Sequence, residues 1–243
     1  FNDPEFTGSL GGVGFGGAGL PQRIIDEILE KRANSMSGIG YGLTETNGVC
    51  AAASGQLFQH APQSAGLTSP IIEVRVVDLD GTDVPLGTEG EIWLRGVSLM
   101  EGYLNQQGEK GLGLTDGWLK TGDIGRLEEG GLLRIVDRIK DVINRAGEKI
   151  AAAEIESCLL QHPDLLEAAV FSQPDATTGE AVVAVVVLAP HAKLGPDEVK
   201  QHVARRLAAY KVPQQVHIRT EVLPKNPAGK MLKNALKREY VQA

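Results

Sequence analysis

The sequence has few cysteines, few aromatic residues and no long apolar run, and each shortage excludes a class of protein. Its 243 residues include two cysteines, Cys50 and Cys158, without the close spacing of a metal site. We expect buried, reduced thiols and a reducing compartment, the cytoplasm. The longest apolar run, residues 181–189, is far shorter than the roughly 20 residues that span a bilayer. No secretory signal is recognisable either, so we expect no membrane span.

Positive charge is concentrated near the end of the sequence, without the aromatic residues that would suit a nucleic acid. The formal net charge is −7. Residues 200–243 carry ten Lys or Arg and two Glu, a charge of +8, which leaves −15 for residues 1–199. Only Tyr210 and Tyr240 lie in the basic stretch, whereas nucleic-acid surfaces usually stack several aromatics. We therefore expect a basic surface for a phosphate-bearing small molecule and no nucleic-acid partner.

Glycine is abundant, with 30 residues, and it raises one alternative early in the chain. Gly12, Gly14 and Gly17 formally match the dinucleotide fingerprint G-x-G-x-x-G. The preceding strand is barely present, however, and no clear acidic residue follows about 20 positions later. An NAD-dependent oxidoreductase is therefore a distant alternative. It predicts repeated strand–helix units after residue 20.

Hydrophobic patterning predicts an α+β (mixed α/β) fold. Residues 8–18 predict a short strand and a glycine-rich turn, before a helix that opens at Pro21. Residues 51–69 are small and polar and predict a loop, whereas short strands over 70–136 predict a small β-barrel. Elsewhere we expect strands over 37–45, 166–171, 181–188 and 216–218, and helices over 152–161, from residue 195 and at the basic end.

A charged turn, Asp137-Arg138-Ile139-Lys140-Asp141, separates these two parts. Four ionisable residues in five positions rarely enter a protein interior, so we expect the whole turn to be exposed. We place a domain boundary at residues 137–140.

Six motifs follow one another along almost the whole chain, and together they resemble the adenylate-forming acyl-/aryl-CoA ligase superfamily. They are Gly16-Gly17-Ala18, Tyr41-Gly42-Leu43-Thr44-Glu45, Gly90-Glu91-Ile92 with Gly102-Tyr103, Thr121-Gly122-Asp123, the turn at 137–141, and Pro224-Lys225 through Gly229-Lys230. The resemblance implies the end of a large N-terminal domain over 1–136, with the barrel at 70–136. It also implies a hinge at 137–140 and a mobile C-terminal domain over 141–243.

The resemblance implies an acid–thiol ligase that uses ATP, Mg²⁺ and coenzyme A. A carboxylic acid, fatty or aryl, would form acyl-AMP and then a thioester with coenzyme A. Donation to a carrier protein and a non-catalytic fragment remain alternatives. The family's Ser/Thr/Gly-rich phosphate loop is missing, so we interpret the chain as the C-terminal part of a longer ligase. We expect this fragment to be inactive alone and prone to self-association.

The same resemblance assigns roles to residues before the turn. Tyr41 would stack on adenine, Thr44 would hydrogen-bond phosphate, and Glu45 would help to hold Mg²⁺. Asp123 would accept both ribose hydroxyls, as a carboxylate with two oxygens can. Glycines and a small residue would let the backbone border the nucleotide and acyl pocket: Gly16, Gly17, Ala18, Gly40 and Gly42.

The remaining roles fall at and after the turn. Arg138 would approach the ribose, and Lys140 occupies the hinge position. Lys230 would bridge carboxylate and α-phosphate oxygens during adenylation. Gly147 would leave room for the pantetheine arm of coenzyme A, although Ala146 stands where many members of the family have a second glycine.

Overall fold

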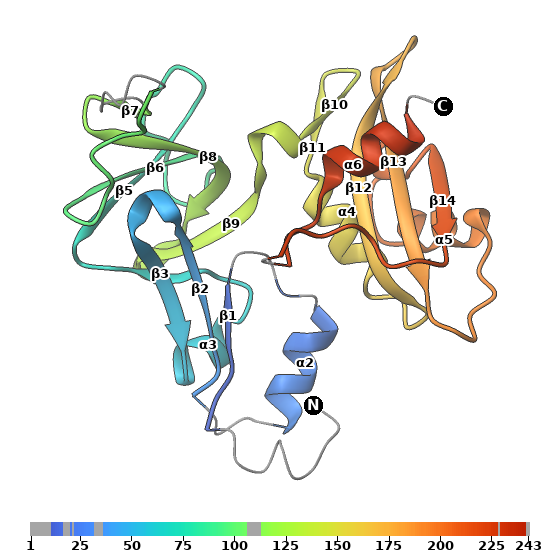
Figure 1. Ribbon diagram of the computed structural model, residues 1–243, viewed down its shortest axis with the longest axis horizontal. Coiled ribbons are helices and arrows are strands. Elements are labelled where there is room, and N and C mark those ends of the chain that lie inside the picture. Colours follow the sequence, from blue (N-terminus) through green and yellow to red (C-terminus); the bar gives the residue numbers. More distant parts are fainter. Residues whose placement is uncertain are drawn as a thin grey trace. The chain divides into compact units, whose positions relative to one another are not determined.

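The computed structural model describes residues 11–16, 20, 22–31, 36–105, 113–227 and 229–241. The chain divides into two compact units (Figure 1). The N-terminal unit comprises Phe1–Leu20 and Ile24–Val136, and the C-terminal unit comprises Pro21–Arg23 and Asp137–Ala243. No helix among the described residues is long and apolar enough to cross a membrane.

The described strands of the N-terminal unit form one nine-stranded sheet in the order β1-β2-β3-β4-β9-β8-β6-β5, with β7 paired to β8. The first pair, β1 and β2, is parallel, and the other pairs are antiparallel. The strands are β1 (Gly14–Gly16), β2 (Gly38–Leu43), β3 (Gly48–Ser54), β4 (Gly66–Thr68), β5 (Ile72–Val77), β6 (Gly90–Gly96), β7 (Leu114–Thr115), β8 (Trp118–Leu127) and β9 (Leu132–Arg138).

The alternation read from the sequence places the core on one face of β5 and β6. Val76 lies opposite Ile92 in an antiparallel register, and both side chains are buried together with Leu94. The predicted strand-rich segment is thus confirmed. Among the described residues no strand pairing closes it into a ring, because the order ends at β5.

The loop predicted over 51–69 is wrong. This segment contains the end of β3, the helix α3 (Gln56–His60) and β4. Its core residues, Ala53 and Phe58, pack with Ile28 of the helix α2 (Gln22–Lys31). Alanines have little strand propensity of their own, so pairing on both sides determines this strand.

The C-terminal unit is a five-stranded sheet with helices on both faces. The order is β11-β10-β13-β12, and β14 joins β13 in parallel. The strands are β10 (Ile143–Arg145), β11 (Glu148–Ile150), β12 (Leu165–Asp175), β13 (Gly179–Leu188) and β14 (Gln215–Arg219). The helices are α4 (Ala152–Leu159), α5 (Pro196–Ala204) and α6 (Lys233–Tyr240).

The central strand β13 explains why this unit is layered. Its valines alternate between two buried clusters, so both faces of the strand must be covered. Val182 and Val186 pack with α4 and α5, whereas Val183 and Val185 pack with Leu236 of α6. The predicted strand buried on both faces is confirmed, and so is the α+β class. Both cysteines are also free and buried, as expected.

Candidate functional site

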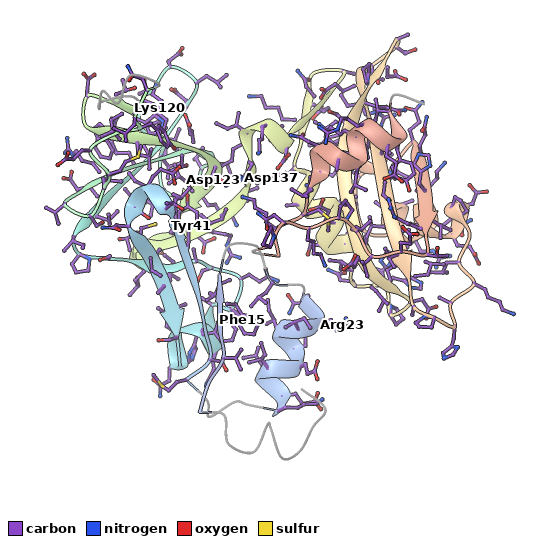
Figure 2. All side chains as sticks on the ribbon, viewed as in Figure 1. Phe15, Arg23, Tyr41, Lys120, Asp123 and Asp137 are labelled. Carbon is purple, nitrogen blue, oxygen red and sulfur yellow. The ribbon has the colours of Figure 1, made fainter. Side chains whose placement is uncertain are left out.

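Tyr41 and Asp123, which lie 82 positions apart in the sequence, are in direct contact in the N-terminal unit. The Tyr41 hydroxyl on β2 donates a hydrogen bond to Asp123 Oδ2 on β8 at 2.7 Å. Figure 2 shows the two side chains meeting between their strands. Asp123 is 3% exposed. Burial first, and then the negative charge of Asp123, raise the pKa of Tyr41 far above its usual range, so this phenol stays a donor.

The backbone around Asp123 is held by side chains of its own strand, β8, and of β6. The Thr121 hydroxyl accepts the Asp123 N–H at 3.0 Å and donates to the Ile92 carbonyl at 2.7 Å. One Glu91 oxygen accepts the Gly122 N–H at 3.1 Å. These bonds explain why a threonine stands two positions before this aspartate and why a glutamate stands in the neighbouring strand. Gly122 between them has φ 70°, a conformation that favours glycine.

The turn that carries Thr44 and Glu45 is a single 3₁₀ turn, Thr44–Thr46, directly after β2. Thr46, the residue directly after the Tyr41–Glu45 motif, holds this turn in place. Its hydroxyl accepts the Leu43 N–H at 2.9 Å and lies 2.8 and 2.7 Å from the Leu43 and Gly48 carbonyl oxygens, to one of which it donates. Thr46 is buried, whereas Thr44 is exposed.

Glu45 is positioned by the loop that follows β6. Its carbonyl accepts the Met100 N–H at 2.8 Å, and the Tyr103 hydroxyl donates to its carboxylate. This bond raises the pKa of the Tyr103 phenol. Tyr103 stands in one of the six motifs, but its pairing with Glu45 was not predicted, because the two residues are 58 positions apart.

Close backbone approach explains Gly42, the glycine that follows Tyr41. A side chain at Gly42 would place its Cβ 2.0 Å from the Gly48 carbonyl oxygen. Gly16 and Gly40 are partners in the parallel β1–β2 pair, and a Cβ at Gly16 would lie 3.3 Å from the Gly40 oxygen. Gly17 and Ala18 lie outside the described residues.

The charged turn is not wholly exposed, and the expectation is wrong for Asp137, which is 8% exposed. Its two carboxylate oxygens accept the Arg138 N–H at 2.8 Å and the Ala153 N–H at 3.2 Å. Ala153 lies in the first turn of α4, so Asp137 caps this helix from outside it. Burial raises the pKa of Asp137. Lys140, in contrast, is exposed in the 3₁₀ turn Ile139–Asp141 that follows Arg138.

Gly147 occupies a tight hairpin turn between β10 and β11. Gly147 has φ 91° and Ala146 has φ 51°, the two positive values of a type I′ turn. No atom lies within 4 Å of a Cβ built at Gly147, so its side is open within this unit. The preceding Arg145 is anchored by donating to the Tyr210 carbonyl at 2.7 Å.

Lys230 is exposed on a tight loop between β14 and α6. The Asn226 side chain accepts the Lys230 N–H at 2.8 Å, and the Asn226 N–H donates to the Lys230 carbonyl at 2.9 Å. Asn226 therefore closes the loop that carries the lysine.

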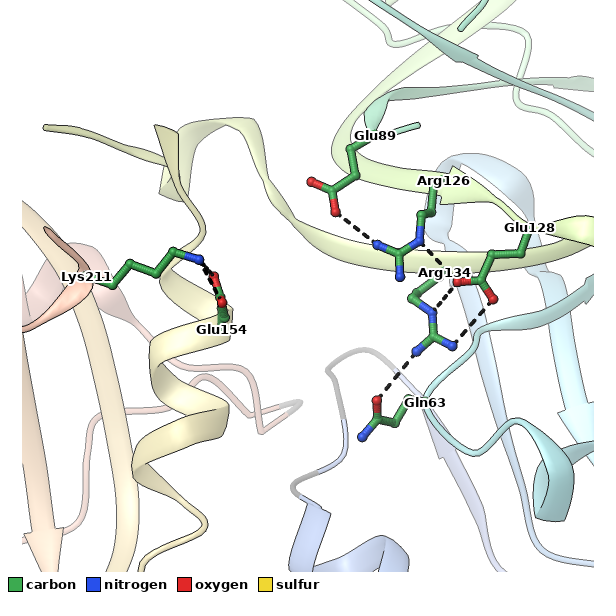
Figure 3. A network of polar contacts seen from close by, with 7 residues as sticks. All are labelled: Gln63, Glu89, Arg126, Glu128, Arg134, Glu154 and Lys211. Carbon is green, nitrogen blue, oxygen red and sulfur yellow. Dashed lines mark hydrogen bonds and ion pairs between the residues drawn. The ribbon is translucent and has the colours of Figure 1, made fainter. Parts of the chain in front are cut away.

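Ion pairs join neighbouring elements within each unit (Figure 3). Glu128 accepts hydrogen bonds from Arg126 at 3.1 Å and from Arg134 at 2.7 Å, joining β8 to β9. The two arginines keep the pKa of Glu128 low. In the C-terminal unit, Lys211 bonds to Glu154 of α4 at 2.6 Å.

Two family models match the chain. The model of the AMP-binding enzymes matches residues 2–104, and that of the AMP-binding enzyme C-terminal domain matches residues 154–230. Among curated proteins, the chain is 41% identical over 227 residues to a long-chain-fatty-acid–CoA ligase of Yersinia pestis, covering 93% of the chain and 40% of the relative. It is 36% identical to a 4-coumarate–CoA ligase of Humulus lupulus, covering 93% and 42%. The chain thus spans about two fifths of these relatives.

Solved structures agree with this similarity. An o-succinylbenzoate CoA synthetase of Bacillus subtilis, in complex with its acyl-adenylate intermediate, superposes with a TM-score of 0.82 at 33% identity, covering 93% of the chain and 46% of that protein. An amide bond synthetase of Marinactinospora thermotolerans gives 0.85 at 31%, covering 96% and 47%. The strand–helix repetition of the oxidoreductase alternative is not found over residues 36–105, where five strands are accompanied by one α-helix, α3, and one 3₁₀ turn. The chain belongs to the adenylate-forming superfamily of AMP-binding enzymes.

Proposed function

We propose that the whole protein carrying this chain activates a carboxylic acid with ATP and transfers the acyl group to coenzyme A. The Tyr41–Asp123 pair carries the proposal. The Asp123 carboxylate is buried and held through both its backbone and its side chain, and its two oxygens suit the two ribose hydroxyls. An acid oxygen attacks the α-phosphorus and pyrophosphate leaves. The thiolate of coenzyme A then attacks the acyl carbonyl and AMP leaves, with the thiol proton passing to solvent.

In the N-terminal unit, Tyr41 would stack on adenine, with Gly16, Gly40 and Gly42 allowing close approach. Thr44 is exposed and would bond a phosphate. The family's Mg²⁺ fits Glu45. No group of three His, Cys, Asp or Glu side chains in the described part of the chain could hold a metal by itself, and Mg²⁺ is usually held by one or two carboxylates together with nucleotide phosphates. Bound there, the ion would neutralise phosphate charge.

In the C-terminal unit, Lys230 would supply a positive charge where negative charge gathers during adenylation, an effect that can contribute several kcal/mol. Arg138 would approach the ribose. Lys140 would be the hinge, supported by its exposure at the start of the unit. Gly147 would border the pantetheine arm, and the basic residues of 200–243 would suit the phosphates of coenzyme A.

The acid is a fatty or an aryl acid, a proposal supported by the fatty-acid and coumarate ligases among the relatives. With a fatty acid as substrate, the protein would serve fatty-acid metabolism in the cytoplasm. Because the chain spans about two fifths of these relatives and has no counterpart of the family's phosphate loop, we propose that it is the C-terminal part of a longer ligase.

ATP–pyrophosphate exchange with a panel of fatty acids, benzoates and cinnamates tests this function. We expect the whole protein to exchange with one acid class and to form a thioester when coenzyme A is added. The Lys230→Gln variant should lose exchange by about a hundredfold or more, and the 243-residue chain alone should not exchange. A whole protein inert towards every acid would refute the proposal, leaving the non-catalytic alternative. Normal exchange by the 243-residue chain would refute the proposal that it is the C-terminal part of a longer ligase.

The acceptor has a second candidate. Similarity to an amide bond synthetase shows that this architecture is not restricted to named CoA ligases. If the whole protein exchanges pyrophosphate without forming a thioester, then the acyl group goes to another acceptor, an amine or a carrier protein. Mass measurement of products with coenzyme A or with added amines separates these outcomes.

A further inference from the structure

Three lysines lie on or beside one short loop of the C-terminal unit, and ion pairs join this segment to β12 and α4. The loop leaves β14 and enters α6, carrying Lys225 before its tip, Lys230 at the tip and Lys233 in the first turn of α6. Lys225 forms an isolated β-bridge with Met231, and Asn226 closes the tip. Lys230 is exposed at the tip. Lys225 is paired with Glu167 of β12, and Lys233 is paired with Glu156 of α4.

The first pair anchors the incoming side of the loop. Lys225 Nζ contacts a carboxylate oxygen of Glu167 on β12, and the other oxygen accepts the Leu223 N–H at 2.6 Å. Glu167 is therefore bonded to both the backbone and a side chain of the loop. Leu223 is buried against β12 and β13, and this packing also holds the incoming side of the loop against the sheet.

The second pair anchors the outgoing side. Lys233 Nζ lies 2.7 Å from Glu156 Oε1 on α4, with the side chains only 15% and 19% exposed. The same oxygen accepts the Val170 N–H of β12 at 2.7 Å. Asp137, which caps α4, adds a further negative charge that acts on Lys233. Leu236, one turn further along α6, is fully buried.

Each glutamate thus binds one loop lysine and one backbone N–H. The two glutamate side chains are only 18% and 19% exposed, so removing the lysine partner of either one leaves a poorly solvated negative charge uncompensated. An anchored loop also has fewer conformations to lose when its tip must take one position. Charge placed in advance where it is needed contributes more to a reaction than charge that must be ordered during it.

We propose that Lys225 and Lys233 are positioning residues that hold the loop and thereby present Lys230 to the reacting phosphate. The proposal rests on the adenylation function proposed above. It deepens that function by assigning the accurate placement of Lys230 to the two Lys–Glu pairs that anchor the loop. It predicts that each anchor serves the half-reaction that needs Lys230.

The anchors can be tested on the 243-residue chain by amide hydrogen exchange, independently of any activity. We expect Lys225→Met and Lys233→Met each to speed exchange over 224–232 by about tenfold or more, with β13 still protected. Lys233→Arg, which keeps the charge, should restore slow exchange. Lys237→Met, the same change one turn further along α6, is the matched control. Unchanged loop exchange in both lysine variants would overturn the proposal.

If Lys233→Met also speeds amide exchange in β13, helix α6 is unfolding in that variant. The Lys225→Met variant, which changes a partly exposed lysine, then decides whether the anchors hold the loop.

The second experiment measures activity and uses the whole protein. Both variants should lower the kcat of pyrophosphate exchange about tenfold with little change in the KM for ATP. Thioester formation from supplied acyl-AMP and coenzyme A should stay within about twofold. Equal losses in both half-reactions would indicate a merely structural role and overturn the proposal. A wild type without exchange refutes the proposed function alone.

Discussion

At the scale of the residue, the bond between Tyr41 and Asp123 is the contact most open to a direct test. Asp123 is almost fully buried, so its carboxylate depends on protein donors. Replacing Tyr41 by Phe removes a donor at 2.7 Å and keeps the ring. We expect the free energy of unfolding of the 243-residue chain to fall by about 1–2 kcal/mol.

Urea denaturation measures this change, and Tyr210→Phe is the control because Tyr210 lies on the surface of the other unit. A Tyr41→Phe chain as stable as the wild type would show that the bond contributes nothing. In the whole protein, the same variant should also bind ATP more weakly, since Asp123 would lose part of its positioning.

The surroundings of His202 predict how the free energy of unfolding depends on pH. It is 7% exposed, and its Nε2 lies 2.8 Å from the Cys158 carbonyl oxygen, to which it donates. Arg206 lies 3.1 Å from Nδ1 and donates to it, so the ring is neutral. Burial chiefly lowers the pKa of His202, and the nearby Arg206 lowers it further. The unfolded chain therefore takes up this proton at a higher pH than the folded chain.

With an unfolded pKa of about 6.5, the contribution of His202 is fully present above that pH. It is lost as the pH falls from there towards the lower folded pKa. Urea midpoints at several pH values should fall on the acid side more steeply in the wild type than in His202→Gln, which can still donate to Cys158. Parallel pH profiles of the two chains would contradict the assignment.

At the scale of the element, local pattern was sufficient where the apolar residues follow the spacing of a strand. The alternation at 72–77 predicts a strand that contributes Ile72 and Val74 to one cluster, and the valine run at 181–188 predicts a strand that contributes to a cluster on each face. The segment 51–69 was not predictable, since Ala51 and Ala53 become strand only through their neighbours β2 and β4. Asp137 was missed for a similar reason: its burial depends on a helix end 16 positions away.

The β10–β11 hairpin contains a local conflict that a substitution should relieve. Ala146 sits at φ 51°, where a Cβ is costly by roughly 1–2 kcal/mol. Ala146→Gly should therefore raise the free energy of unfolding by about 0.5–1 kcal/mol, after the entropy that glycine adds to the unfolded chain. Denaturant unfolding measures the gain.

The same substitution at Ala208 is the matched control. Ala208 has φ −60°, a conformation that alanine adopts freely, so Ala208→Gly should lower stability. Opposite signs at the two positions would support the strain at Ala146. A loss of stability in both variants would refute it.

At the scale of the whole molecule, the candidate site was predictable only in part. The six motifs assigned Tyr41, Thr44, Glu45, Asp123 and Lys230 through their resemblance to a family, which the comparisons confirm, whereas the roles themselves stay predictions. What no motif could supply is the supporting contacts. Hydrogen bonds formed by Thr46, Tyr103 and Glu156 hold neighbouring segments in place. Nothing in the local sequence pattern predicts these bonds.

The N-terminal unit exposes large apolar side chains on neighbouring elements of one sheet, which leads to the last prediction. Val49 on β3 and Leu67 on β4 are 63% and 46% exposed, and Ile71, which follows β4 in the sequence, is 53% exposed. Surfaces of this kind associate to remove apolar area from water. We expect the 243-residue chain to self-associate through this surface, with a sedimentation mass that rises with concentration.

Salt distinguishes this mode from attraction between the acidic part of the chain and its basic end. At an ionic strength of about 1 M the Debye length is only about 3 Å, so charge-driven association would be lost and apolar association would persist. Val49→Lys should reduce the mass towards that of a single chain. Val222→Lys, at a valine of the C-terminal unit that is 74% exposed, should not reduce the mass. If the association disappears at high salt, or if both variants reduce it equally, then attraction between charges causes it and not this face of the sheet.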